Sequence, residues 1–294
     1  RTVEIYAGVL ERFTSFCAES WPGKDPVDML NQQVIRSYEV SLMDSGTMSA
    51  KTVGLHLSVL SGCCRFLMKE GRMKSNPVHL VKRPKVEKRL PEFYRDEAVS
   101  EYFDSTCGDA EYGNYAQQLS RVIISILFNT GLRRSELISL KRSSIDMGRR
   151  VLRVRGKGNK MREIPLIPSL CEEIALYLQS AEKVAGGVSG PDTPLLLTPK
   201  GGPLYPVYID RVVKKELSQV DGITGRKSPH VLRHTLATEL LGGGTDLNSI
   251  KELLGHSSLA ATQVYTHNSI ERLKSVYNNA HPRAKNGGKN GDKD

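Results

Sequence analysis

Hydrophobic side chains recur every three or four residues through the first part of the chain, which is the spacing of amphipathic helices. The first such run extends from Thr2 to Cys17 and ends before the helix-breaking stretch WPGKDP. A second run covers Asn31 to Asp44, and a third begins near Ser49 and continues to Gly71. This pattern predicts a small all-helical domain over residues 1–80.

In the second part of the chain, short alternating stretches stand between apolar helical runs. Residues 119–129 predict a strongly apolar helix, whereas VLRVR and REIPLI predict two strands joined by the glycine-rich turn GKGNKM. The stretch LLLT, residues 195–198, is a candidate third strand. Further helices are expected at about 206–218, 231–241 and 246–254.

The C-terminal end carries one more helical pattern. The stretch SIERLKSVY, residues 269–277, has one apolar face and is suited to docking elsewhere. Residues 285–294 are rich in Gly, Asn and Lys, so we expect a disordered tail. The second domain is therefore predicted over residues 94–284, and the fold class is mainly α with a small β-sheet.

Residues 81–93, VKRPKVEKRLPEF, differ in composition from both neighbours. Pro84 and Pro91 preclude a regular helix, and five basic residues stand before Glu92 against the single acid Glu87. We expect a basic linker that lies along a negatively charged partner. A basic linker that is simply surrounded by water is the commoner case.

The charge balance narrows the class of partner. The 294-residue chain has 42 Lys and Arg against 32 Asp and Glu, a net charge of +10, and a pI near 9.3. This excess favours nucleic acid or an anionic membrane surface. No apolar run reaches the roughly 18 residues of a membrane span, and no secretory leader is visible. The five cysteines form no CxxC pair and predict buried free thiols in a reducing compartment, neither a disulfide framework nor a zinc site.

Two basic stretches of the second domain hold candidate chemistry. In NTGLRRSEL, Arg133 lies at the start of a helix that follows Gly131, with Glu136 one turn later. It is either a surface or structurally paired arginine, or a guanidinium held over an oxyanion. In RGKGNKMREIP, Lys157 lies on the hairpin turn, where it is either solvated or able to donate a proton.

Two further stretches add histidines and a tyrosine. SPHVLRHTLATELL places His230 and Arg233 three residues apart, on one face of a helix. LLGHSSLAATQVYTH places His256 just after a helix end and Tyr265 nine residues later. Each residue has an ordinary structural explanation, and most tyrosines are packing residues.

Taken together, these six residues form an inventory for one reaction. Arginine forks match phosphate oxygens, histidine and lysine move protons, and tyrosine can serve as a covalent nucleophile. The sequence has no carboxylate cluster suited to Mg²⁺ and no GxxxxGK[ST] motif. We therefore expect phosphoryl transfer through a phosphotyrosine, without a metal or another cofactor.

The order of these four stretches resembles the tyrosine recombinases, also called the phage integrase family, and especially its bacterial Xer-like members. The likeness spans nearly the whole chain and implies a SAM-like helical core-binding domain before an α+β catalytic domain. The family's catalytic residues fall on Arg133, Lys157, His230, Arg233, His256 and the nucleophile Tyr265. Two positions depart from the family: residues 242–247 are richer in glycine, and Glu239 stands where Xer-like members often carry histidine.

The resemblance implies site-specific recombination of double-stranded DNA through a 3′-phosphotyrosine, without ATP. It also implies a homo-tetramer on two DNA sites, or an assembly with a paralogous recombinase, and accessory DNA-bending or directionality proteins. A bacterial, cytoplasmic and nucleoid-associated protein is expected. Lys51, Arg83 and Lys85 are the expected DNA contacts outside the catalytic set.

Two other functions stay open at this point. A type IB topoisomerase would use related chemistry, and a DNA-binding regulator would use none. The biological role is equally open between dimer resolution, integration of a mobile element and inversion.

Overall fold

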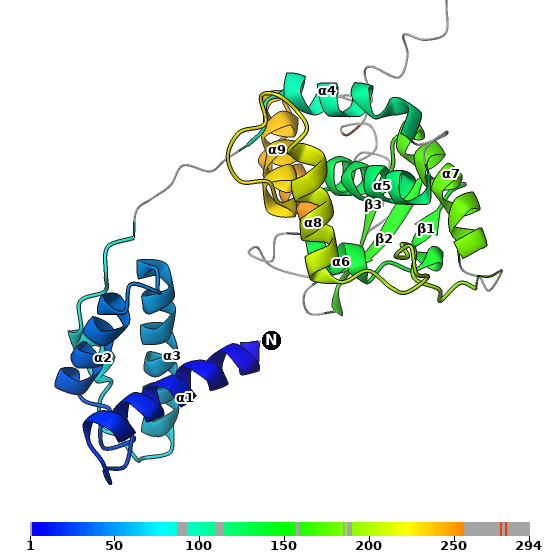
Figure 1. Ribbon diagram of the computed structural model, residues 1–294. Helices are drawn as coiled ribbons and strands as arrows, with labels where there is room; N and C mark the ends of the chain where they lie inside the picture. Colours follow the sequence, from blue (N-terminus) through cyan, green and yellow to red (C-terminus); the bar gives the residue numbers. More distant parts are fainter. Residues whose placement is uncertain are drawn as a thin grey trace, which may run out of the picture. The chain divides into compact units, whose positions relative to one another are not determined.

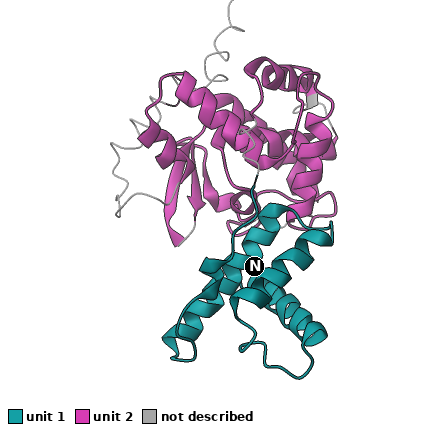
Figure 2. Ribbon diagram, turned by 90° about the vertical axis from the view of Figure 1, so that its left-hand side faces the viewer, with its two compact units in different colours: residues 1–90 teal, residues 91–294 magenta. Residues whose placement is uncertain are grey.

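Two separate hydrophobic cores organise the chain in the computed structural model, which describes residues 2–86, 93–109, 114–156, 159–184, 186, 190–255, 277 and 280. The chain divides into two compact units, residues 1–90 and 91–294 (Figure 2). The expected helix at 269–277 lies outside the described residues except for Tyr277, and the expected tail at 285–294 lies wholly outside them.

The first unit is built from the expected helices, α1 (Thr2–Ser20), α2 (Gln32–Asp44) and α3 (Ala50–Lys69), followed by the short 3₁₀ helix η1 (Pro77–Leu80). Asn31 caps α2 by accepting a hydrogen bond from the Val34 N–H, and Ser49 caps α3 by accepting one from the Thr52 N–H. The inward faces of the three helices form the core of this unit.

The second unit is packed around its own central helix, α5 (Tyr115–Thr130), whose residues 118–130 are all buried. Figure 1 shows α5 at the centre, with α7 on one side and α8 and α9 on the other. The other helices with bounds among the described residues of this unit are α4 (Asp96–Ser105), η2 (Cys107–Asp109), α6 (Arg134–Ile138), η3 (Arg142–Ser144), α7 (Pro168–Val184), α8 (Pro206–Leu217), α9 (Pro229–Gly242) and α10 (Leu247–Leu254). This arrangement confirms the mainly helical fold class.

An antiparallel sheet in the order β1-β2-β3 completes the described part of this unit. The strands are β1 (Ile145–Asp146), β2 (Val151–Arg155) and β3 (Met161–Pro165), with Val154 paired to Arg162 across the second pair. The two strands expected from VLRVR and REIPLI are confirmed.

The expected third strand at 195–198 is wrong. Leu195, Leu196 and Leu197 are buried, but Leu197 makes only an isolated bridge to Pro203. Their hydrophobicity reflects burial in the core rather than membership of the sheet. The third strand is β1 instead, which is too short and too polar to give an alternating pattern.

Candidate functional site

Three arginines from three different elements meet at the last turn of α10. Each donates to a different carbonyl of three consecutive residues: Arg162 Nε to Leu253 at 3.1 Å, Arg233 Nη2 to Leu254 at 2.7 Å, and Arg133 Nη2 to Gly255 at 2.9 Å. The last carbonyls of a helix have no partner within the helix and carry the negative end of its dipole. The end of α10 therefore gathers three positive charges.

The positions of Arg133 and Arg233 follow from how α5 ends. Gly131 caps α5 in the left-handed conformation, with φ of 60°, and the chain turns there towards α6. Arg233 Nη1, from α9, donates to the Gly131 carbonyl at 2.6 Å. A Cβ on Gly131 would lie 2.5 Å from Leu254 Cδ2, so any other residue here would strain the backbone and displace the Leu254 side chain.

Glu136 connects two of the arginines. It is 5% exposed, and its Oε1 accepts from Arg133 Nη1 at 2.8 Å and from Arg162 Nη1 at 3.0 Å. Its Oε2 accepts from the Arg133 backbone N–H and from Arg162 Nη2, both at 2.9 Å. Burial raises the pKa of this carboxyl, but the bonds from Arg162 and Arg133 outweigh burial and hold the pKa below its usual value. Glu136 is therefore ionised at neutral pH.

Arg233 is 8% exposed, which makes it the more deeply buried of the two predicted arginines. Burial, followed by the charge of Arg133, lowers the pKa of Arg233 to about 10. The guanidinium still carries its charge at neutral pH. A buried charge of this kind interacts more strongly with an anionic ligand than an exposed one does.

His230 lies in the first turn of α9, one turn before Arg233. His230 is exposed at the surface, but partial desolvation of its ring lowers its pKa, and so do four nearby positive charges, those of Arg134, Arg226, Arg233 and Arg133. The imidazole is therefore neutral at pH 7 and able to accept a proton. The neighbouring His234 instead packs edge-on against Phe93, with ring centroids 6.5 Å apart.

The structure thus brings together three of the six predicted catalytic residues, Arg133, His230 and Arg233. Lys157, His256 and Tyr265 lie outside the described residues. The two residues that precede Lys157 and His256 in the chain are Gly156 and Gly255, and both are described.

The three predicted DNA contacts lie in the first unit and are exposed. Lys51 is in the first turn of α3, and Arg83 Nη1 donates to Ser58 Oγ of the same helix at 3.1 Å. Lys85 follows two residues later.

Sequence reasoning missed Arg162 and took Glu136 only as a structural partner for Arg133. The signal for Arg162 was its register. Val154, its partner on β2, is buried, so the strand pattern places a charged residue on an inward face. A charge in such a position needs a buried partner.

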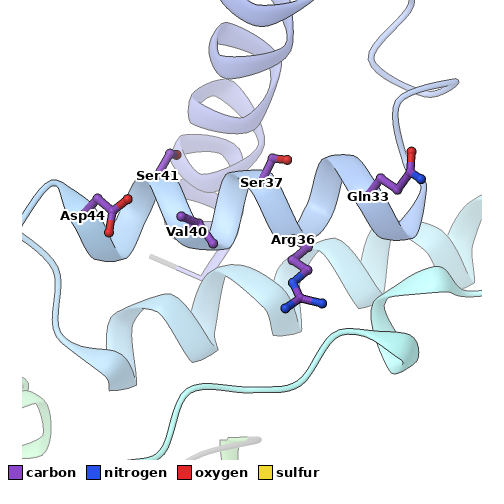
Figure 3. Close-up of a pocket in the computed structure, with 6 residues that line it drawn as sticks. All are labelled: Gln33, Arg36, Ser37, Val40, Ser41 and Asp44. Carbon is purple, nitrogen blue, oxygen red and sulfur yellow. The ribbon is translucent and has the colours of Figure 1, made fainter.

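A separate hollow of about 530 Å³ lies along one face of α2 in the first unit (Figure 3). Its lining is mixed, with one arginine, one aspartate and one valine among polar residues: Gln33, Arg36, Ser37, Val40, Ser41 and Asp44. It contains none of the predicted site residues.

Across the part of the chain that the structure describes, no helix is both long enough and apolar enough to cross a bilayer.

Comparison with known proteins finds relatives over most of the chain. Residues 108–272, more than half of the chain, match the model of the phage integrase family. The tyrosine recombinase XerC of Chlorobaculum parvum is 33% identical over 97% of this chain and 90% of its own length. XerC of Mycobacterium sp. strain KMS is 36% identical over 96% of this chain and 93% of its own length.

Among solved structures, the XerH site-specific recombinase bound to its difH substrate has a TM-score of 0.68. It is 20% identical and covers 94% of this chain and 76% of that one, a likeness of fold. The family match and the XerC relatives together identify the family: the chain belongs to the phage integrase family of tyrosine recombinases.

Proposed function

We propose that this chain is a tyrosine recombinase that cleaves and rejoins double-stranded DNA at specific sites. The observation that carries the proposal is the meeting of Arg133 and Arg233 at the end of α10, beside a neutral His230. Two guanidiniums at one point form a site for a phosphodiester, and a neutral imidazole beside them can take up a proton. The recombinase names of its relatives, and a structural neighbour solved with DNA, support the same substrate.

In the proposed reaction, the Tyr265 hydroxyl attacks the scissile phosphorus. The bond from phosphorus to the tyrosine oxygen forms, and the bond to the 5′-oxygen breaks. His230 takes the proton of the tyrosine hydroxyl, and Lys157 gives a proton to the leaving 5′-oxygen. Arg133, Arg233 and His256 hold the non-bridging oxygens and stabilise the charge of the transition state. Attack by the 5′-hydroxyl of a partner strand reverses the step, so ATP is not consumed.

The bonds of the arginines to α10 are compatible with this role. Arg233 makes two bonds to backbone carbonyls and Arg133 makes one, beside its bond to Glu136. A guanidinium carries more N–H groups than these bonds use. The arginines are held in place by backbone while they address a phosphate, which is the preorganisation that electrostatic catalysis needs.

The proposal extends to the DNA contacts of the two domains, the oligomeric state and the cellular location. The first unit is proposed as a DNA-binding domain, with Lys51, Arg83 and Lys85 on phosphates and residues 81–93 as a basic linker. The catalytic domain would extend over residues 94–284. A homo-tetramer on two DNA sites, or an assembly with a paralogous recombinase, would carry out exchange. Accessory DNA-bending or directionality proteins, and association with the bacterial nucleoid, complete the proposal.

The test starts from the DNA that the protein selects. Genomic fragments retained by the full chain are sequenced, and a nicked duplex of the shared sequence is made as a suicide substrate. The wild type is expected to form a covalent adduct on a denaturing gel, and Tyr265→Phe is expected to form none. Tyr205→Phe, which alters an exposed tyrosine at the start of α8, serves as the control and should keep the adduct.

An adduct that persists in Tyr265→Phe would contradict the assignment of the nucleophile. Exchange of strands between two marked sites separates a recombinase from a topoisomerase. Relaxation of supercoils without any exchange would overturn the proposed recombination while keeping the chemistry.

A further inference from the structure

We propose that Arg162 is a positioning residue that holds the backbone of three separated parts of the site in one arrangement. The inference rests on the proposed function, since the groups it positions are those of the proposed reaction. It assigns a role in catalysis to a residue that need not touch DNA.

The first observation is the set of bonds that Arg162 makes. Its two Nη atoms form a fork on Glu136, at 3.0 and 2.9 Å, and its Nε reaches the Leu253 carbonyl at 3.1 Å. Glu136 in turn holds both the side chain and the backbone N–H of Arg133. One guanidinium therefore connects β3, the start of α6 and the end of α10.

The second observation is what lies near the guanidinium. A Cβ placed on Gly255 would lie 2.9 Å from Arg162 Nη1 and 3.1 Å from Cζ. A Cβ placed on Gly156 would lie 3.4 Å from the same Nη1. The Arg162 guanidinium thus lies close to the backbone of both Gly156 and Gly255. In the sequence, Lys157 directly follows Gly156, and His256 directly follows Gly255.

Only arginine has the shape for this position. Its planar fork presents donors in several fixed directions, so it can grip a carboxylate with two nitrogens and still reach a carbonyl with the third. A lysine keeps the charge on a single nitrogen and loses this geometry. The substitution of Arg162 by lysine therefore keeps the positive charge but removes the hydrogen bonds that hold the neighbouring segments in position.

The test compares Arg162→Lys with a matched control, Arg121→Lys. Arg121 is as buried as Arg162, at 4% against 5%, and pairs with Glu173 at 2.9 Å in a different part of the same unit. Single-turnover adduct formation is measured at saturating suicide substrate, well below the melting temperature of each variant. A misplacement of catalytic groups by about 1 Å can cost about 100-fold in rate, so a loss of that order is expected for Arg162→Lys. Arg121→Lys should keep a rate near that of the wild type.

A second readout separates positioning from lost stability. A suicide substrate with sulfur in place of the bridging 5′-oxygen releases a thiolate, which leaves without a proton. If Arg162 also sets the backbone at Gly156, which Lys157 follows in the sequence, the slowing of Arg162→Lys relative to the wild type is smaller on this substrate than on the ordinary one. The ratio for Arg121→Lys should be the same on both substrates. Equal slowing of Arg162→Lys on both substrates would contradict the link through Gly156.

A third variant controls for misfolding. Glu136 also pairs with Arg133 at 2.8 Å, so Arg162→Gln does not leave the buried carboxylate without a charged partner. Arg162→Gln should therefore fold and still lose the rate. Wild-type rates in Arg162→Lys, or an equal loss in Arg121→Lys, overturn the inference and leave the proposed function standing. A wild type that forms no adduct on either substrate instead overturns the proposed function.

Discussion

At the scale of single residues, the guanidiniums of this site satisfy groups that the fold would otherwise leave without partners. Arg233 alone joins the carbonyls of Gly131 and Leu254, at the ends of two helices. Each such bond to a charged donor is worth roughly 1.5–3 kcal/mol. The charge that the proposed reaction needs is thus held in place by contacts that also join the ends of α5 and α10.

Glu239, also on α9, is the residue that departs from the Xer-like pattern. Neither of its carboxylate oxygens has a hydrogen-bond partner among the described residues, and both are buried. Burial, followed by the charge of Asp96, raises the pKa of Glu239 to about 8. The carboxyl is therefore mostly protonated in the folded protein at pH 7.

This carboxyl makes stability depend on pH. The folded protein holds the proton of Glu239 more tightly than the unfolded chain does, so stability falls as pH rises from about 4.5, its ordinary value, to about 8. Glu239→Gln removes the ionisable group, and we expect it to stabilise the protein at pH 8.5 by about 2 kcal/mol. At pH 5 the two proteins should differ little. Chemical denaturation at both pH values measures this, with Glu97→Gln on the exposed side of α4 as control. The same shift at both pH values would count against it.

At the scale of elements, local signals located most of the helices. Helices α2 and α3 begin where helical runs were expected to start, and Asn31 and Ser49 cap them there. The left-handed Gly131 ends α5. Contacts across the chain were beyond such signals. Arg162 meets Glu136 only because β3 packs beside α6 and α10, which no local pattern encodes. The residues 195–198 were misread because a buried apolar run looks alike in a strand and in an irregular core segment.

The glycine that follows α10, Gly255, can be tested against a matched glycine in the first unit. Gly255 and Gly71 both follow a helix in the left-handed conformation, with φ of 66° and 69°. A Cβ on Gly71 would meet nothing within 4 Å, whereas one on Gly255 would press on Arg162. Gly71→Ala should therefore cost only the backbone strain, about 1 kcal/mol, and keep the rate of adduct formation. Gly255→Ala should cost more and also lower that rate. Calorimetry and the suicide substrate measure the two effects, and equal results for both variants would refute the special role of the α10 end.

At the scale of the whole molecule, two cores that share no residue suggest two independent folding units. We expect fragments 1–86 and 93–294 each to unfold cooperatively, as seen by circular dichroism. The intact chain should bind its DNA with a steeper salt dependence than either fragment, because more phosphates are neutralised at once. The slope of log K against log salt from gel-shift titrations gives this comparison. If the slope for the intact chain is no steeper than that of fragment 93–294, the first unit makes no phosphate contacts.

Charges in active sites commonly strain the free enzyme, so that replacing them raises stability while activity is lost. The arginine contacts to Leu253, Leu254 and Gly255 are expected to reverse this relation here. Selection for folding and selection for chemistry then act on the same atoms. Inactivating substitutions at Arg133 or Arg233 are expected to lower the amount of protein in the cell as well as its activity. A copy of this chain silenced at Arg133 or Arg233 would therefore not persist as a stable DNA-binding relic unless the end of α10 changed with it.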